Sequence, residues 1–437
     1  MDKMDNYYEV KPVYKPINCE IEVPGSKSIT NRALLLASMA QGKSVLKNVL
    51  FSDDSRGFLD CLTALGYDIT VNEADKTVEL TGGFPIRKTV INVRSAGTSA
   101  RFLTAMLAAY EGEYTVEASE QMKARPMKPL MDILNSLGCK IEYLDKEGFL
   151  PFKLFCNGLS GGEVTLETGQ SSQFLSALLM TGVLHKNDLK ISLSGKGTAK
   201  SYVDITLKMM EQFGVSAGRT EPGSSAEPTN GKSYFVKSGQ KYFSREFKIE
   251  PDVSSACYFY AAAAMTGGTA LVRDVYFSSV QGDIKFLDIL KNLGCTVNET
   301  GGGVLLKGPT QGRYNGIEVD MNDCSDQTMT LAAMAPFALS PTVIRNIKHI
   351  KYQESNRIQA ILTELAKMGI KCGETDDGII IYPGAPNPSV VETYEDHRMA
   401  MAFSLVGLRA GGVKISDPAC TAKTFENYFE IFEGIYN

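Results

Sequence analysis

The sequence predicts a mixed α/β fold made of six copies of one helix-and-strand repeat, arranged as two domains of three copies each. A polar segment followed by a small-residue apolar helix recurs six times, and a second helix accompanies each first one. After five of the second helices come a glycine and short stretches of strand-like alternation. A chain of 437 residues is too long for one ordinary core, which also favours two domains.

The six polar helix starts are almost evenly spaced. Anchor residues 27, 97, 171, 254, 326 and 397 are separated by 70, 74, 83, 72 and 71 positions. A helix N-terminus attracts anions through its free N–H groups and its dipole. If each domain bundles its first helices in parallel, up to six N-termini would face one interdomain cleft and bind a multiply charged anion.

The second helices are expected over 58–65, 130–137, 205–213, 284–293, 358–368 and 425–432, and a glycine follows each of the first five directly. Cys139 and Cys295 occupy the same place in their repeats, which indicates core packing. The sixth repeat has no residues left for its strands, so we expect the N-terminal strands within 14–23 to complete it. One domain would then span 25–249 and the other 1–24 and 250–437, with the active site in the cleft between them.

Composition and charge exclude several classes of protein. The net charge of −5 argues against a nucleic-acid or anionic-membrane binder. No apolar stretch is long enough to cross a bilayer and the N-terminus lacks an apolar signal segment, so a cytoplasmic protein is expected. Nine scattered cysteines and three histidines favour reduced thiols and argue against a zinc site or a His-rich metal centre. We expect a monomer.

The segment at 23–32 combines a Pro-Gly turn with Ser26, Lys27 and Ser28 ahead of an apolar helix. It is typical of a phosphate or carboxylate site, although ordinary helix capping explains the same residues. It is not a Walker loop, because the nearest candidate, Gly42-Lys43-Ser44, has Ala37 where the first glycine is required.

Motifs along nearly the whole chain resemble the 5-enolpyruvylshikimate-3-phosphate synthase family of enolpyruvyl transferases. These motifs are Pro24-Gly25-Ser26-Lys27-Ser28 with Asn31-Arg32, Ala96-Gly97-Thr98 with Arg101, Arg125-Pro126, Ser171-Ser172-Gln173-Phe174-Leu175, Tyr202-Val203-Asp204-Ile205-Thr206, Asp326, Glu354 with Arg357, Asp396-His397-Arg398-Met399-Ala400-Met401, and Cys420-Thr421-Ala422-Lys423-Thr424-Phe425. The resemblance implies two domains, each of three βαβαββ-type units around a helical core, in an inside-out α/β barrel. It also implies transfer of the enolpyruvyl group of phosphoenolpyruvate to the 5-hydroxyl of shikimate 3-phosphate, with release of phosphate and without a cofactor.

The resemblance further implies a role for each motif residue. Phosphoenolpyruvate would be held by Lys27, Gly97, Arg125, Gln173, Arg357, Arg398 and Lys423. Shikimate 3-phosphate would be held by Ser28, Arg32, Ser171, Ser172, Gln173, Tyr202 and Asp326. Asp326 would accept the hydroxyl proton, and Glu354, three residues before Arg357 on the same helical face, would handle the CH2 and CH3 protons together with Lys27.

Each role has a structural alternative. Asp326, Ser171 and Ser172 could be helix caps, Glu354 with Arg357 a surface ion pair, and Tyr202 a packing aromatic. His397 is better explained as a structural histidine, and Arg101 as a support for the turn at Gly97.

Four residues depart from the family pattern. Ala199 replaces a serine that touches the shikimate 3-phosphate phosphate, which leaves Thr198 or Ser201 to supply a hydroxyl. Gln353 replaces a substrate-contacting lysine, for which Lys351 could compensate, and His349 and Ser95 stand where asparagine is frequent.

Two other functions compete. The sister reaction uses UDP-N-acetylglucosamine as acceptor, but that family carries a reactive cysteine before its Arg-Pro motif, whereas this loop, 118–124, has none. A non-catalytic protein that senses an anionic metabolite is disfavoured by Lys27, Asp326 and Glu354, which are all proton-transfer side chains.

Overall fold

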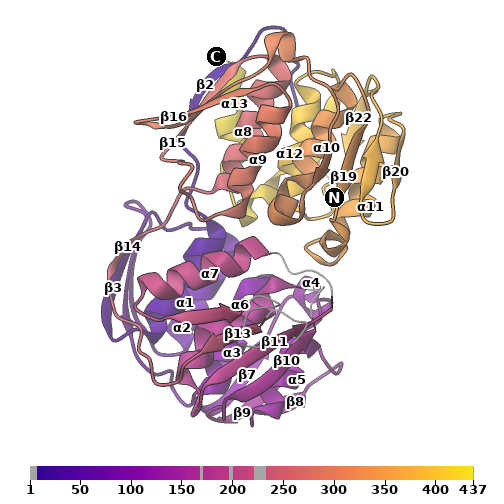
Figure 1. Ribbon diagram of the computed structural model, residues 1–437. Helices are drawn as coiled ribbons and strands as arrows, with labels where there is room; N and C mark the ends of the chain where they lie inside the picture. The colour runs from indigo at the N-terminus through magenta and orange to yellow at the C-terminus, as the bar shows by residue number, and fades with distance from the viewer. Residues whose placement is uncertain (1–6, 168–170, 196–199, 221–232, 437) are drawn as a thin grey trace, which may run out of the picture. The chain divides into compact units, whose positions relative to one another are not determined.

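The computed structural model describes residues 7–167, 171–195, 200–220 and 233–436 (Figure 1). The chain divides into two compact units, one spanning 25–249 and the other 1–24 with 250–437. We call them the insert unit and the terminal unit.

The described residues of the insert unit form three four-stranded sheets. Their orders are β14-β3-β5-β4 (Glu246–Lys248, Gly42–Lys47, Thr77–Gly82, Asp68–Asn72), β6-β7-β9-β8 (Lys88–Asn92, Glu111–Glu117, Phe152–Asn157, Lys140–Tyr143) and β10-β11-β13-β12 (Gly162–Glu167, Leu189–Ser194, Ser233–Val236, Ala217–Thr220). In each sheet the first two strands are parallel and the other neighbours are antiparallel. The three sheets therefore repeat one topology.

The terminal unit repeats this topology in two of its sheets. Its orders are β16-β17-β15-β2 (Thr296–Thr300, Gly303–Lys307, Thr269–Arg273, Asn18–Ile21), β18-β19-β21-β20 (Glu318–Asp320, Thr342–Arg345, Ile379–Ile381, Cys372–Glu374) and the three-stranded β1-β23-β22 (Tyr7–Glu9, Val413–Ser416, Ser389–Val391). The predicted α/β class with repeated βαβαββ-type units is confirmed. Among the described residues each sheet is a separate open sheet, and none closes into a barrel.

The N-terminal strands do not pair as expected. The strand within 14–23, β2, pairs in parallel with β15 of the fourth repeat instead of completing the sixth. It is the earlier strand β1 that joins the sixth repeat, antiparallel to β23. The physical reason is that β2 supplies the parallel edge strand that comes before α8 in this repeat. The insert unit lies between β2 and α8 in the sequence.

Each unit has three central helices. They are α1 (Lys27–Met39), α3 (Gly97–Ala109) and α6 (Ser172–Thr181) in the insert unit, and α8 (Val253–Thr266), α10 (Thr328–Met334) and α12 (His397–Gly407) in the terminal unit. In the insert unit α3 packs against α1 and α6, whereas α8, α10 and α12 all pack against one another. Nearly every residue of these helices is buried, as expected for helices that are apolar all round.

A second set of helices is amphipathic, and all but the last of them pack against strands of the sheets. These are α2 (Asp53–Ala64), α5 (Lys128–Ser136), α7 (Lys200–Gln212), α9 (Phe286–Asn292), α11 (Arg357–Lys367) and α13 (Tyr428–Glu433). The five glycines that follow the first five of them have φ between 77° and 108°, the left-handed conformation of a helix C-terminus. The predicted second helices and their glycine ends are confirmed.

The cysteines are free thiols, as predicted. Cys139 and Cys295 are both buried in the core, in keeping with their equivalent places in the repeat. None of the described helices combines the length and the apolar content that crossing a bilayer requires.

Candidate functional site

In the insert unit the expected site residues gather at helix N-termini. Lys27, Gly97 and Ser172 are the first residues of α1, α3 and α6, and Tyr202 lies in the first turn of α7. Ser171 caps α6 by accepting a hydrogen bond from the Gln173 N–H at 3.2 Å, so the capping alternative holds for it. Ser26, by contrast, makes no capping bond with its side chain.

Arg32 is buried and bound entirely by neutral groups. Its Nε donates to Thr206 Oγ1 at 2.8 Å, and its other nitrogens donate to Ser176 Oγ and to the carbonyls of Ser28 and Tyr202. Burial lowers its pKa to about 10, although the nearby Tyr202 opposes this shift. With 1% of its surface exposed, Arg32 ties α1 to α6 and α7.

Two arginines surround Gly97. A Cβ at this glycine would lie 2.9 Å from Arg101 Nη1 and from both terminal nitrogens of Arg125, so a larger residue would displace these guanidinium groups. Arg101 donates to Gln173 Oε1 at 2.5 Å and lies over the Phe174 ring, 4.8 Å from its centroid. Burial and the charge of Arg125 both lower the pKa of Arg101.

No carboxylate of the described residues lies within ion-pair distance of Arg101 or Arg125. Two adjacent guanidinium groups without a counter-ion attract a carboxylate or a phosphate, which they can bind in bidentate fashion. This part of the insert unit is therefore suited to bind an anion.

Lys27 has an acidic neighbour that the sequence analysis did not identify. Its Nζ lies 3.4 Å from Oδ2 of Asp54 in α2, and the Asp54 side chain is 4% exposed. The pair Asp53-Asp54 directly after Ser52 resembles an ordinary acidic helix start, which is why it carries little information in the sequence.

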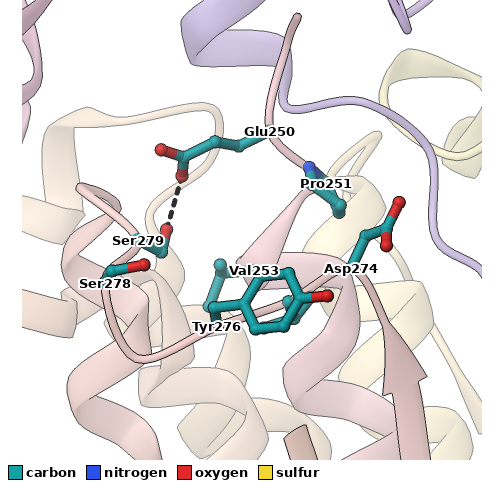
Figure 2. A pocket seen from close by; sticks show the side chains of 8 residues that line it. Glu250, Pro251, Val253, Asp274, Tyr276, Ser278 and Ser279 are labelled. Carbon is teal, nitrogen blue, oxygen red and sulfur yellow. Dashed lines mark hydrogen bonds between the residues drawn. The ribbon is translucent and has the colours of Figure 1, made fainter. Parts of the chain in front are cut away.

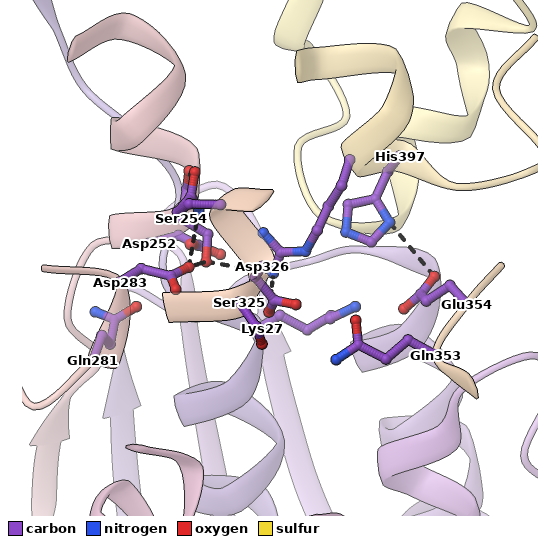
Figure 3. Close-up of polar contacts among 12 residues, drawn as sticks. Lys27, Asp252, Ser254, Gln281, Asp283, Ser325, Asp326, Gln353, Glu354 and His397 are labelled. Carbon is purple, nitrogen blue, oxygen red and sulfur yellow. Dashed lines mark hydrogen bonds and ion pairs between the residues drawn. The ribbon is translucent and has the colours of Figure 1, made fainter. Parts of the chain in front are cut away.

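In the terminal unit the expected residues form a cluster of paired charges (Figure 3). Arg357 lies between two carboxylates, with Nη1 2.9 Å from Asp326 Oδ1 and Nε 2.8 Å from Asp396 Oδ2. Arg398 Nη2 lies 2.9 Å from Asp326 Oδ2. Asp326, which belongs to the 3-10 helix η4 (Asn322–Gln327), therefore binds two arginines through its side chain.

Burial and charge compete at this cluster. Burial alone would lower the pKa of Arg357, but Asp396 and Asp326 outweigh it and raise this pKa. Burial likewise opposes the ionisation of Asp396, yet Arg357 and His397 hold its pKa below the usual range. Both groups stay charged at neutral pH.

Glu354 does not lie where the sequence analysis placed it. The helix α11 begins at Arg357 with Asn356 as its cap, so Glu354 precedes the helix and shares no helical face with Arg357. Its Oε2 lies 2.7 Å from Lys423 Nζ and 3.5 Å from His397 Nδ1. The expected i, i+3 pair is wrong, because the Asn356 side chain accepts from the Gln359 N–H and stops the helix there.

The residues that depart from the family pattern have definite partners. The side-chain amide oxygen Oε1 of Gln353 accepts from Arg357 Nη1, and His349 Nε2 lies 2.9 Å from Ser325 Oγ. Lys351 Nζ is paired with Glu374 Oε1 at 2.6 Å, so its charge is already balanced by this carboxylate. Ser95 lies in the turn before α3, whereas Thr198 and Ala199 fall outside the described residues.

Glu354, Asp396 and His397 lie close enough together to suggest a metal site. Their negative charge is, however, already balanced by Lys423 and Arg357. Proton transfer and anion binding suit this arrangement better than metal coordination.

A small cavity of about 100 Å³ lies at the start of the terminal unit's second segment (Figure 2). Ser279 donates to Glu250 across it at 2.6 Å, and Gln281 donates to Glu250 and to the Pro251 carbonyl. None of the expected site residues lines it. It belongs to the segment where the chain passes from one unit to the other, and there the Asp252 N–H donates to the Pro24 carbonyl at 2.8 Å.

Comparisons with known proteins agree with the motifs. Residues 13–432 match the family model described as EPSP synthase (3-phosphoshikimate 1-carboxyvinyltransferase). The chain is 44% identical over 421 residues, 96% of each sequence, to a protein of that name from Trichormus variabilis, and 41% identical to one from Sulfurovum sp. over 98% of this chain and 99% of the relative.

The fold agrees with solved structures as well. An EPSP synthase from Acinetobacter baumannii superposes with a TM-score of 0.80 at 24% identity, covering 98% of both chains. Together with the family match, this makes the chain a transferase of the EPSP synthase family.

Proposed function

We propose that this protein transfers the enolpyruvyl group of phosphoenolpyruvate to the 5-hydroxyl of shikimate 3-phosphate and releases phosphate, a step in aromatic amino-acid biosynthesis. The observation that carries the proposal is the family match over residues 13–432. The paired arginines at Gly97 and the charge cluster around Asp326 supply the chemistry that this reaction needs.

We propose that both units contribute residues to one active site between them. Lys27, Gly97, Arg125, Gln173, Arg357, Arg398 and Lys423 would hold phosphoenolpyruvate, and Ser28, Arg32, Ser171, Ser172, Gln173, Tyr202, Asp326 and Gln353 would hold shikimate 3-phosphate. The protein would act as a cytoplasmic monomer without a cofactor.

The reaction requires an addition followed by an elimination. Asp326 would take the proton of the 5-hydroxyl as its oxygen bonds to C2 of phosphoenolpyruvate, while Glu354 or Lys27 delivers a proton to C3. Removal of a proton from the resulting methyl group then restores the double bond as the C2–O bond to phosphate breaks. Lys27 and Lys423 would neutralise the departing phosphate.

Phosphate release measured in parallel with two acceptors tests the proposal. Shikimate 3-phosphate with phosphoenolpyruvate should release phosphate, and UDP-N-acetylglucosamine should not. Activity with the second acceptor alone would assign the sister reaction. Inactivity with both, when the substrates are shown to bind, would favour a protein that senses the anion.

A further inference from the structure

Asp283 is a buried carboxylate that feels the charge of Arg398 but forms no ion pair with any described residue. It lies in the 3-10 helix η2 (Gly282–Lys285) and is 7% exposed. No lysine or arginine of the described residues lies within ion-pair distance of it. Burial raises its pKa to about 6, and the charge of Asp326 adds to this shift. Burial of a carboxylate costs free energy of folding, and carboxylates with strongly shifted pKa values cluster at functional sites.

Ser254 connects Asp283 to Arg398. The Ser254 hydroxyl donates to Asp283 Oδ2 (Figure 3). The same hydroxyl lies 3.4 Å from Arg398 Nη2. A hydroxyl has one proton and two lone pairs. Because Asp283 takes the proton, a lone pair remains for Arg398 Nη2, the nitrogen that also lies 2.9 Å from Asp326 Oδ2.

Gln327 makes a second connection. Its Nε2 donates to Asp283 Oδ2 at 2.9 Å and lies 3.4 Å from the Ser254 carbonyl oxygen, while its Oε1 accepts from Thr330. Gln327 is fully buried and follows Asp326 directly in η4. One carboxylate thus links η2 to the start of α8 and to the segment that carries Asp326.

We propose that Asp283 is a positioning residue for Arg398, which it orients through the hydroxyl of Ser254 so that the guanidinium can bind phosphoenolpyruvate. The inference rests on the proposed function, because it assigns Arg398 to that substrate. Ser254 is the relay, and Asp283 contacts no substrate itself.

The test compares variants along this relay in steady-state phosphate release. Ser254→Ala removes the hydroxyl and leaves the Asp283–Gln327 bond intact, so the KM for phosphoenolpyruvate should rise about tenfold while the KM for shikimate 3-phosphate stays within twofold. Ser254→Thr restores a hydroxyl and should recover most of this loss. The double variant Ser254→Ala/Asp283→Ala should have no higher phosphoenolpyruvate KM than Asp283→Ala alone, because the two residues act in series.

Asp288→Ala is the matched control, since Asp288 lies in α9 and is an exposed partner of Lys291. If Asp283→Ala does not fold, as judged by its thermal unfolding, the comparison of Ser254→Ala with Ser254→Thr decides alone. An active wild-type enzyme with an unchanged phosphoenolpyruvate KM in Ser254→Ala overturns the positioning role only. An inactive wild-type protein overturns the proposed function, and the positioning role with it.

Discussion

The two units use the same repeat topology but hold their site cations in opposite ways. In the insert unit, Arg32 and Arg101 are bound by hydroxyls, an amide and carbonyl groups. In the terminal unit, Arg357, Arg398 and Lys423 are each paired with a carboxylate at 2.7–2.9 Å.

This difference separates two chemical tasks. Cations without counter-ions leave a net positive charge that an incoming anion can neutralise. Cations that hold carboxylates fix the position of those carboxylates, as a base or a proton carrier requires. The comparison indicates that the insert-unit arginines without a carboxylate partner serve anion binding, whereas the terminal-unit cations also hold the carboxylates that transfer protons.

Lys27 is the exception in the insert unit, since it lies 3.4 Å from Asp54. We expect Lys27→Met to lower kcat by about 1,000-fold or more, within the range for the loss of a proton-transfer group. Steady-state phosphate release would measure this. The matched control is Lys43→Met on β3, where the lysine pairs with Glu79 and is half exposed, and it should leave kcat unchanged. A kcat in Lys27→Met equal to that of the wild type would remove Lys27 from the mechanism.

Asp396→Ala tests the paired charges of the terminal unit. The change leaves Arg357 buried with one carboxylate fewer and removes the cap of α12, where Asp396 accepts from the Arg398 N–H. We expect the free energy of unfolding to fall by about 3–5 kcal/mol, as when one partner of a buried ion pair is removed. Urea denaturation would measure it.

Asp377→Ala is the corresponding control, because Asp377 forms an exposed pair with Arg345 at 3.6 Å. Asp377→Ala should lower the free energy of unfolding by less than about 1 kcal/mol. Similar decreases in the free energy of unfolding of Asp396→Ala and Asp377→Ala would contradict the importance of burial in the cluster.

The repeat was readable in the sequence because it depends on local rules. Apolar helices preceded by polar segments, and glycines such as Gly66 and Gly294 at helix ends, follow from backbone geometry alone. Strand pairing does not follow from local geometry, since paired strands such as β2 and β15 lie about 250 residues apart in the sequence. Their pairing depends on tertiary contacts that periodicity cannot reveal.

The site was predictable in its residue types and less so in its pairing. Lys423 and Glu354 were both expected, but not as partners, because their contact joins distant segments. Asp54 and Asp283 were missed, since acidic residues near a helix start are ordinary in sequence. Only the tertiary structure shows that they lie beside Lys27 and Ser254.

The histidines give a further comparison between the units. The half-buried His349 of the terminal unit lies beside Ser325, whereas neither ring nitrogen of the buried His185 of the insert unit has a hydrogen-bond partner among the described residues. Burial lowers the pKa of His185 to about 4. Its unfolded pKa is about 6.5, so the unfolded state binds the proton first as pH falls.

The stability that neutral His185 contributes is therefore complete above about pH 6.5 and is lost as the pH falls towards 4. We expect a loss of about 3 kcal/mol between pH 7.5 and 4 that His185→Phe does not show. Urea denaturation of both proteins across this range would measure it. Parallel pH profiles would mean that His185 does not titrate as its burial requires.

Arg125→Ala tests the unpaired charges of the insert unit and should have the smallest effect. Removing one of two adjacent cations relieves repulsion on Arg101, so we expect the free energy of unfolding to change by less than about 1 kcal/mol. The KM for phosphoenolpyruvate should nevertheless rise about tenfold or more, equivalent to about 1.4 kcal/mol per factor of ten. Arg87→Ala, at an exposed pair with Glu111, should change neither quantity. A large loss of stability without a change in KM would show that Arg125 is a structural cation like Arg357, and the contrast between the units would fail at this residue.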